Sequence, residues 1–276
     1  MKKLNILMIS FAIIVAVVVS FATVSKQGYG IPVLLYHHVL PEAYNRNFID
    51  NPAVISMENF TEQMQYLYDN DFHTLSLDEL YSILFEGADI PPRSVMIQFD
   101  DGYYSNIVYA LPVLRDFGFT AQLFLITHLV EAQGDYQPQI DHDDLTWTAA
   151  RSLIGTEDVF ETASHTHNLH REGLLYHANR GQIIEDTLRS FEFVNDHRAF
   201  AYPRGQYNDA VVEALQYAGI RMAFTVQEGY ITANSNPMHL NRFVVFRDTN
   251  MSRFHNIVHG RRSGVISRVL SRIGEF

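Results

Sequence analysis

The chain alternates short apolar runs with stretches in which apolar residues recur at helical spacing. The apolar runs predict buried strands over residues 31–36, 94–99, 121–126, 158–163, 199–202, 222–226 and 241–246. The helical spacing predicts helices over residues 60–68, 77–85, 107–114, 184–191 and 211–218. Because repeated strand–helix alternation implies parallel strands joined by crossovers, the pattern predicts an α/β fold. About seven such units in one domain favour a distorted (β/α) barrel over an open sheet.

Local signals refine these elements. Ser76 precedes the helix over residues 77–85 as an N-cap, and Pro112 predicts a kink within the stripe over residues 107–114. Residues 131–144 are polar and carry no apolar period, which predicts a surface loop. Ile184, Leu188 and Phe191 recur at helical spacing and mark a further helix.

The amino terminus carries a membrane signal. Lys2 and Lys3 precede an apolar run over residues 4–24, which is long enough to cross a bilayer as a helix with a cytoplasmic amino terminus. We therefore expect a transmembrane anchor over residues 1–25 and an extracytoplasmic barrel over residues 26–276, in a single-pass protein of the cell membrane. The alternative is a cleaved signal peptide, which would make the protein secreted.

Composition narrows the chemistry. The 276 residues include no cysteine, which excludes disulfides and thiolate metal sites. The formal charge of −11 disfavours a nucleic-acid partner. The chain has 13 histidines, and because cysteine is absent, any transition-metal site must use imidazole and carboxylate ligands.

Two adjacent carboxylates, Asp100 and Asp101, follow the predicted strand over residues 94–99. Neighbours in a regular strand face opposite sides, so the two can share a pocket only if the strand ends there, which Gly102 permits. One carboxylate could then hold a metal while the other accepts a proton from bound water. The alternative is an ordinary Asp-Gly turn with solvated carboxylates.

Three histidines follow the strand predicted over residues 158–163. They are His165, His167 and His170. Two imidazoles and one carboxylate suit a catalytic zinc ion, which keeps positions open for water and substrate. His165 and His170 could converge only in a segment that bends, because five positions on a helix rotate by roughly 140°. The pair His165/His167 would suit a strand face instead, and a plain histidine-containing loop is the third alternative.

A third strand end, the AYPRG segment at residues 201–205, breaks into a turn. Proline and glycine restrict this backbone, so an N–H group there could face a developing oxyanion. An ordinary turn is the alternative.

Together these segments resemble a known family. The order DDG at 100–102, SHTHNLH at 164–170 and AYPRG at 201–205 is similar to that of polysaccharide deacetylases, the NodB-homology group called carbohydrate esterase family 4. The LLYHHV segment at 34–39 and LTW at 145–147 resemble the branch that acts on poly-N-acetylglucosamine. The resemblance runs over nearly all of the predicted barrel.

The resemblance implies a barrel enzyme that uses a divalent ion, with zinc as the first expectation, to remove N-acetyl groups from an aminosugar polymer. It implies Asp100 as the catalytic base and Asp101, His165 and His170 as metal ligands. It further implies that four residues line the acetyl and oxyanion region, namely Trp147, Tyr202, Pro203 and Arg204. His37, at the end of the first strand, either faces the site or serves as a packing histidine.

The chain departs from the family pattern in two ways. Its two metal-binding histidines are separated by five positions rather than four, and the late leucine-x-x-histidine motif that supplies the proton donor has no clean copy. His239, His255 and His259 are the candidates that remain for the donor. Two other functions stay open: an O-acetyl carbohydrate esterase on the same scaffold, and a catalytically inert polysaccharide-binding module.

Overall fold

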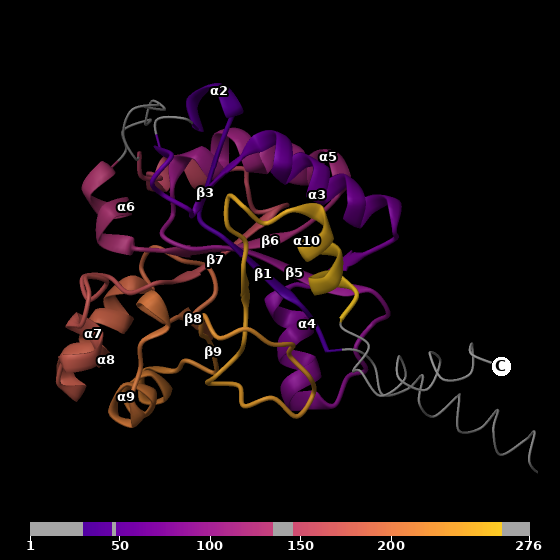
Figure 1. The fold of residues 1–276 in the computed structure, drawn as a ribbon. Helices are drawn as coiled ribbons and strands as arrows, with labels where there is room; N and C mark the ends of the chain where they lie inside the picture. Colours follow the sequence, from indigo (N-terminus) through magenta and orange to yellow (C-terminus); the bar gives the residue numbers. More distant parts are fainter. Residues whose placement is uncertain (1–29, 46–47, 135–145, 261–276) are drawn as a thin grey trace, which may run out of the picture.

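The computed structural model describes residues 30–45, 48–134 and 146–260 of the chain. Its centre is a curled sheet of parallel strands in the order β10-β1-β5-β6-β7-β8-β9, with a further short strand, β4, paired to the start of β5 (Figure 1). The strands are β1 (Val33–Tyr36), β4 (His73–Thr74), β5 (Ser94–Phe99), β6 (Ala121–Leu125), β7 (Phe160–Ser164), β8 (Ala199–Ala201), β9 (Met222–Phe224) and β10 (Phe243–Val244). A separate pair joins β2 (His38–Leu40) to β3 (Val54–Ser56).

The segment over residues 240–244 links the two edges of the sheet. Leu240 forms a parallel bridge with Phe224 of β9, and Phe243 pairs with Leu34 of β1. The strands therefore curl into a half-barrel, consistent with the predicted (β/α) barrel.

Helices cover the outside of the curled sheet. The helices and helical turns are α2 (Glu42–Asn45), α3 (Met57–Asp69), α4 (Leu77–Tyr81), η2 (Ser82–Glu86), η3 (Asn106–Ala110), α5 (Leu111–Phe117), α6 (Thr127–Gln133), η4 (Ala150–Leu153), α7 (Leu174–His177), α8 (Arg180–Ser190), η5 (Pro203–Gly205), α9 (Asp209–Ala218) and α10 (Met251–Val258). Figure 1 shows α3, α5 and α10 on one side and α7, α8 and α9 on another. Alternate strand residues pack outward against these helices, as Leu34 does toward α3 and Phe200 toward α9.

The other strand residues fill the inside of the barrel. Val33, Met96, Phe124, Ala163 and Phe224 belong to this inner core. This alternation follows from the two-residue period of a strand, and it sets which side chains reach the inside at each end.

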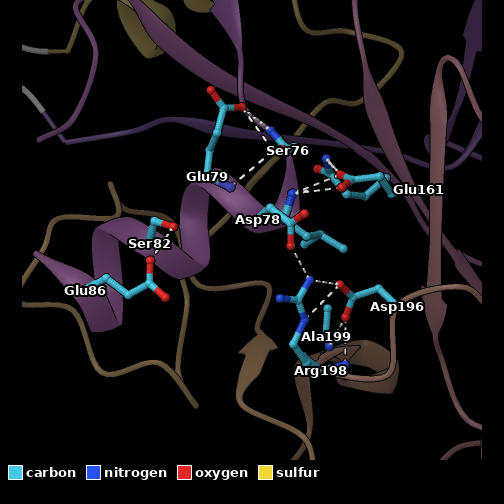
Figure 2. Close-up of polar contacts among 11 residues, drawn as sticks. Ser76, Asp78, Glu79, Ser82, Glu86, Glu161, Asp196, Arg198 and Ala199 are labelled. Carbon is cyan, nitrogen blue, oxygen red and sulfur yellow. Dashed lines mark hydrogen bonds and ion pairs between the residues drawn. The ribbon is translucent and has the colours of Figure 1, made fainter. Parts of the chain in front are cut away.

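Helix α4 closes the amino-terminal end of the barrel. It begins with a capping box in which Ser76 accepts from the backbone N–H of Glu79, and the Glu79 side chain accepts from the backbone N–H of Ser76. The N–H of Leu77 donates to both carboxylate oxygens of Glu161, at 3.1 and 2.9 Å (Figure 2). Gln122 also donates to Glu161, at 2.8 Å. The charged groups at this end are therefore used to fix a helix.

Several predicted elements differ from the observed ones. Pro112 lies in the first turn of α5, directly after the wide turn η3, with which α5 is continuous. The helix marked by Ile184, Leu188 and Phe191 is confirmed as α8, but Leu188 is 50% exposed, and the fully buried side carries Ile183 and Thr187. The predicted loop from residue 131 is wrong at its start, since Glu131 lies in α6; residues 135–145 lie outside the described residues.

The predicted transmembrane segment over residues 1–25 also lies outside the described residues. Within the three described ranges, every helix is too short or too polar to cross a membrane.

Candidate metal centre and active site

Polar side chains replace apolar ones where the inner core reaches the carboxyl ends of the strands. Along β5, Gln98 and Asp100 follow inward-facing Met96, and along β7 His165 follows inward-facing Ala163. Asp100 is 2% exposed and His165 is also 2% exposed. Such burial of ionisable groups is costly unless each finds a partner, so this end of the barrel needs an explanation.

The two adjacent carboxylates share this space because the chain turns sharply after β5. Asp101 and Gly102 have left-handed backbones with φ of 74° and 83°. A Cβ atom at Gly102 would lie 2.8 Å from Cδ2 of Leu125, so only glycine fits this turn. As a result, Nε2 of His165 lies 3.5 Å from Oδ1 of Asp101 and 3.9 Å from Oδ2 of Asp100.

The histidine segment bends after β7, as convergence of His165 and His170 requires. Thr166 has a φ of 75°, and the next three backbone N–H groups, at residues 167–169, all donate to the carboxylate of Asp186 on α8, at 2.6–3.1 Å. This anchored loop places Nε2 of His170 3.1 Å from Oδ1 of Asp101.

Asp101, His165 and His170 together form a candidate metal centre. Their ligand atoms all lie within 4.8 Å of one another, and ligands held about 2.0–2.2 Å from one zinc ion have comparable separations. Nδ1 of His165 lies 2.8 Å from the carbonyl oxygen of Ala201, which leaves Nε2 directed at Asp101. A backbone partner of this kind is typical of histidines that bind metals. His167 is not in the cluster; its Nδ1 contacts Thr127 at 2.9 Å.

The electrostatics keep this cluster ready to bind a cation. Burial alone would raise the pKa of Asp101, but the hydrogen bond from His170 and the charges of His37 and His165 hold it far below its usual range. Burial lowers the pKa of His165 to about 4. At neutral pH the cluster therefore offers an ionised carboxylate and a neutral imidazole, the forms that a metal ion requires.

Asp100 is held by a different partner, Arg242. The guanidinium of Arg242 is fully buried and donates to both oxygens of Asp100, at 2.8 Å each. Its Nε donates to the carbonyl of Thr225 at 2.7 Å. Burial alone would raise the pKa of Asp100, but the charge of Arg242 outweighs burial and lowers it. Asp100 is therefore a rigidly oriented, ionised carboxylate next to the candidate metal centre.

Two stacked aromatic rings, those of Tyr103 and Trp147, lie next to the acidic pair. Tyr103 hydrogen-bonds to Asp101 through its side chain, and its ring stacks on Trp147 with centroids 4.7 Å apart. Trp147 is thus separated from Asp101 by one ring, which places it at the edge of the site.

His37 reaches the acidic pair from the end of β1. Its charge is one of the influences that lower the pKa of both Asp100 and Asp101. Its Nδ1 is buried and has no hydrogen-bond partner among the described residues. Leaving a buried nitrogen without a hydrogen-bond partner costs free energy, so Nδ1 of His37 is a candidate to bind a polar group of a ligand.

The AYPRG segment lies beside His170, but only some of its side chains line the space next to that histidine. The side chain of Tyr202 faces outward, where it packs on Phe200 and donates to the carbonyl of Met238 at 3.1 Å. Pro203 and Arg204 line a small depression together with His170. Arg204 has a φ of 55°, and its side chain extends toward solvent. Of the three, Pro203 and Arg204 line the depression next to His170, whereas Tyr202 does not.

The three histidines considered as proton donors lie in different places. His255 stacks on Tyr66 with centroids 3.9 Å apart, and His259 contacts the hydroxyl of Tyr66 at 2.8 Å. Both therefore belong to the packing of α10 on α3, outside the barrel. His239 stacks on Tyr207 with centroids 4.6 Å apart.

Sequence reasoning missed three residues that organise the site: Arg242, Asp186 and Tyr103. Two carried a signal. Arg242 is the one charged residue in the apolar stretch over 238–246, and Asp186 falls on the buried side of α8 between Ile183 and Thr187. A lone charge on an apolar face indicates a buried partner.

The fold and the site place this chain among (β/α)-barrel proteins with a candidate metal centre at the carboxyl ends of the strands. The profile of the family described as polysaccharide deacetylase matches residues 87–223, which include Asp100, Asp101, His165 and His170. Residues 87–223 therefore correspond to a polysaccharide deacetylase domain.

Relatives and solved structures agree with this assignment. The chain is 28% identical over 235 residues to a poly-beta-1,6-N-acetyl-D-glucosamine N-deacetylase of Staphylococcus aureus, covering 78% of each chain. It is 29% identical over 218 residues to the enzyme of the same name from Staphylococcus epidermidis, covering 72% of this chain and 70% of that one.

The fold is similar to those of two solved deacetylases. The Streptococcus pyogenes deacetylase PplD, solved in complex with acetate, has a TM-score of 0.71 at 21% identity, covering 83% of this chain and 98% of that one. IcaB from Ammonifex degensii has a TM-score of 0.66 at 22% identity, covering 84% of this chain and 97% of that one.

Proposed function

We propose that the protein hydrolyses N-acetyl groups on an N-acetylglucosamine polysaccharide, and that poly-beta-1,6-N-acetylglucosamine is its polymer. The names of the staphylococcal relatives support this substrate. The observation that carries the proposal is the convergence of two carboxylates and two imidazoles, with Asp100 adjacent to the Asp101/His165/His170 cluster.

We assign the cluster of Asp101, His165 and His170 to a divalent ion, with zinc proposed first. The His₂Asp donor set also suits cobalt, nickel or iron. When bound, such an ion polarises a water molecule and the amide carbonyl. Burial lowers the pKa of His165 to about 4, so this imidazole need not lose a proton at neutral pH to act as a ligand.

Asp100 is proposed as the general base. Each of its oxygens accepts one hydrogen bond from Arg242, and a carboxylate oxygen retains a further lone pair that can accept the proton of a water molecule. The guanidinium keeps Asp100 ionised over the physiological range but also makes it a weaker base. Its advantage is therefore its fixed position more than its basicity.

We propose that His37 contacts the substrate and protonates the departing amine. Support comes from the influence of its charge on both Asp100 and Asp101 and from its Nδ1, which is buried and has no partner among the described residues. The backbone at Arg204 and the side chains of Pro203 and Trp147 are proposed to border the acetyl group. For Tyr202, a contact with substrate is proposed through its backbone only.

The decisive experiment is an acetate-release assay on β-1,6-linked N-acetylglucosamine oligomers with a series of divalent metals. Asp100→Asn should keep its metal and lose about 10²–10⁴-fold in kcat, the range for removal of a general base. His165→Ala should lose the metal itself, as measured by metal analysis of the purified protein. Full turnover by Asp100→Asn would refute the base assignment.

Two further arms separate the alternatives. Release of acetate from O-acetylated but not N-acetylated oligosaccharides would identify an O-acetyl esterase. A metal-free protein that binds the glycan as tightly as the metal-loaded one, without hydrolysis, would identify an inert binding module.

We also propose that residues 1–25 anchor the barrel, residues 26–276, on the outer side of the cell membrane. The apolar run over residues 4–24 and the two lysines before it support this location. Recovery of the full-length chain in the soluble fraction, with Lys2 and Lys3 retained, would contradict the anchor, whereas loss of the first residues would identify a secreted form.

A further inference from the structure

Residues 30 and 260, the first and last that the structure describes, lie on the same face of the barrel. Gly30 lies just before β1, and a Cβ atom there would lie 2.5 Å from Cβ of Tyr230. The hydroxyl of Tyr230 donates to the carbonyl oxygen of Ile257, in the last turn of α10, at 3.0 Å. One side chain therefore joins the segment that enters β1 to the end of α10.

This face is the amino end of the barrel. The ring of His259 packs on the ring of Phe72, with centroids 5.5 Å apart. Phe72 directly precedes β4, which pairs with the first residues of β5. The Asp101/His165/His170 cluster follows the last residues of β5 and β7, so it lies at the carboxyl end. Because β5 has six residues, about 20 Å separates the two ends.

Residues 261–276 lie outside the described residues, but their sequence carries a regular pattern. Apolar residues recur at the spacing of one helix face, namely Ile266, Val269, Leu270 and Ile273. At roughly 100° per residue, Arg268 and Arg272 fall on the other side of such a helix. The pattern predicts a basic amphipathic helix, the kind of segment that lies in a membrane surface with its apolar face toward the lipid.

The charge of residues 261–276 is opposite to that of the whole chain. This segment contains four arginines and one carboxylate, Glu275, whereas the chain has a formal charge of −11. An anionic lipid surface therefore repels most of the protein but attracts this segment, since basic residues close to such a surface favour binding. Charge complementarity thus indicates a lipid partner with negative headgroups.

We propose that residues 261–276 bind the anionic surface of the membrane and hold the amino end of the barrel against it. The inference rests on the proposed function in one respect, because it takes residues 1–25 to be the anchor. The chain from residue 25 to residue 30 can span at most about 18 Å, so the anchor brings the same face close to the lipid. The candidate metal centre, at the other end, then points away from the membrane and is open to a long polymer.

The anchor and residues 261–276 reinforce each other in this arrangement. Because the anchor already holds the barrel at the surface, binding of the second segment is intramolecular and gains from a high effective concentration. Each arginine near an anionic surface should shift the ratio of lipid-bound to free segment by about 5-fold. A second contact on the same face also restricts how far the barrel can tilt.

Fluorescence can measure the orientation, because the chain has no cysteine and a single introduced cysteine takes the label. The full chain is reconstituted in vesicles of phosphatidylcholine and phosphatidylglycerol that carry a quencher on their headgroups. Ala233→Cys labels the amino end, beside Thr232, whose Cγ2 lies 3.3 Å from the position of a Cβ atom at Gly30. Glu172→Cys labels the carboxyl end, where the Glu172 side chain is 72% exposed. Quenching should be several-fold stronger at residue 233 than at residue 172.

A label at Ser271→Cys reports on the second segment itself. Its quenching should rise when phosphatidylglycerol is added to vesicles of phosphatidylcholine. Arg268→Gln should lower the ratio of bound to free segment by about 5-fold. Arg180→Gln removes an exposed arginine at the start of α8 and is the matched control, which should leave this ratio unchanged.

Equal quenching at residues 172 and 233 would overturn the proposed orientation and leave deacetylation intact. So would a label at residue 271 that responds neither to phosphatidylglycerol nor to Arg268→Gln. Flotation of the full chain, added to preformed vesicles without reconstitution, separates the two segments. Binding that requires phosphatidylglycerol, by a chain that otherwise stays in solution, would support the role of residues 261–276 and refute the anchor. A correctly oriented chain that releases no acetate would refute the proposed deacetylation alone.

Discussion

The two ends of the same barrel use ionisable residues in opposite ways. Strand β7 carries an inward-facing ionisable group at each end, Glu161 and His165, with Ala163 between them. At the amino end, Glu161 receives the N–H of Leu77 on both oxygens. At the carboxyl end, His165 faces two carboxylates instead. A single ionisable residue at the end of a strand therefore does not indicate a functional site. The indication is several ionisable side chains that converge on the same space.

Two aspartates extend this comparison. Asp196, at the amino end, accepts the backbone N–H groups of Arg198 and Ala199 and pairs with the Arg198 side chain (Figure 2). Asp186, at the carboxyl end, accepts three backbone N–H groups from the histidine loop. Both hold a turn in place, but only the turn held by Asp186 carries a residue of the cluster. The same physical device serves stability at one end and the site at the other.

The largest expected effect comes from breaking the buried ion pair at the carboxyl end. Arg242→Gln leaves the carboxylate of Asp100 buried without a cation, so we expect a loss of about 3–5 kcal/mol in the free energy of unfolding. Arg198→Gln is the matched change at the amino end. Its side chain is 37% exposed, and solvent screening should limit the loss to about 1 kcal/mol. Urea denaturation of both variants measures the difference.

Arg242→Gln also tests the electrostatics of Asp100. Without the guanidinium, burial should raise the pKa of Asp100, so the acidic limb of the profile of kcat/KM against pH should move to higher pH. Two outcomes would show that Arg242 is not the group that keeps Asp100 ionised. One is equal stability of Arg242→Gln and Arg198→Gln, and the other is an acidic limb of the pH profile that does not move.

The next effect is a fall in stability on acidification that originates at His38. Burial lowers the pKa of His38 to about 4 in the folded chain, against about 6.5 when unfolded. As pH falls, the unfolded chain takes up the proton first, so stability is lost between about pH 6.5 and 4, by roughly 3 kcal/mol in total. Nε2 of His38 has no partner among the described residues, so a charge there finds no compensation.

Denaturation of wild type and His38→Gln at pH 7 and pH 4.5 measures this contribution. The variant should lose clearly less stability on acidification. It keeps the fall caused by His165, whose pKa burial also lowers to about 4. Both proteins must be metal-free, because a bound metal adds its own pH dependence. An identical fall in the two would rule out His38 as a source.

A smaller effect should follow from releasing the histidine loop. Asp186→Ala removes the common acceptor of three backbone N–H groups, so His170 loses its fixed position beside Asp101. We expect metal affinity to fall by about 10- to 100-fold, as for other residues that orient metal ligands. Asp196→Ala is the matched control at the amino end and should leave metal affinity unchanged. Metal titration of both variants decides, and an equal loss in the two would point to general destabilisation.

The sequence predicted the parts of this molecule that depend on local pattern. The apolar run over 94–99 coincides with β5. The polar clusters that follow β5 and β7 were candidate site segments because they stand where apolar strands end. The choice of His165 and His170 among the histidines came from the family resemblance. The interactions that the sequence did not reveal join residues that are far apart in the chain. Arg242 lies 142 positions from Asp100, and no local rule connects them. The stripe at Ile184, Leu188 and Phe191 found helix α8 but not its fully buried side, which turns Asp186 toward the histidine loop and leaves Leu188 exposed.

The smallest expected effect concerns Glu161 at the amino end. Burial raises its pKa in the folded chain, even though Gln122 and the N–H of Leu77 favour the ionised form. The folded chain therefore holds this proton more tightly than the unfolded one, and wild-type stability declines as pH rises from the ordinary glutamate pKa to the raised value. Glu161→Gln removes this decline but gives up one hydrogen bond to α4.

The two contributions nearly cancel, so Glu161→Gln should change the free energy of unfolding by about 1 kcal/mol or less. The stability of the variant relative to wild type should be higher at pH 8 than at pH 4. Acetate release should not change, because the Glu161 side chain is hydrogen-bonded to Leu77 of α4 and Gln122 of β6, at the end of the barrel opposite the cluster. A large loss of activity would show that the two ends of the barrel are coupled. An unchanged rate would mean that two ionisable groups on one strand, separated by a single alanine and a pair of outward-facing residues, serve independent purposes.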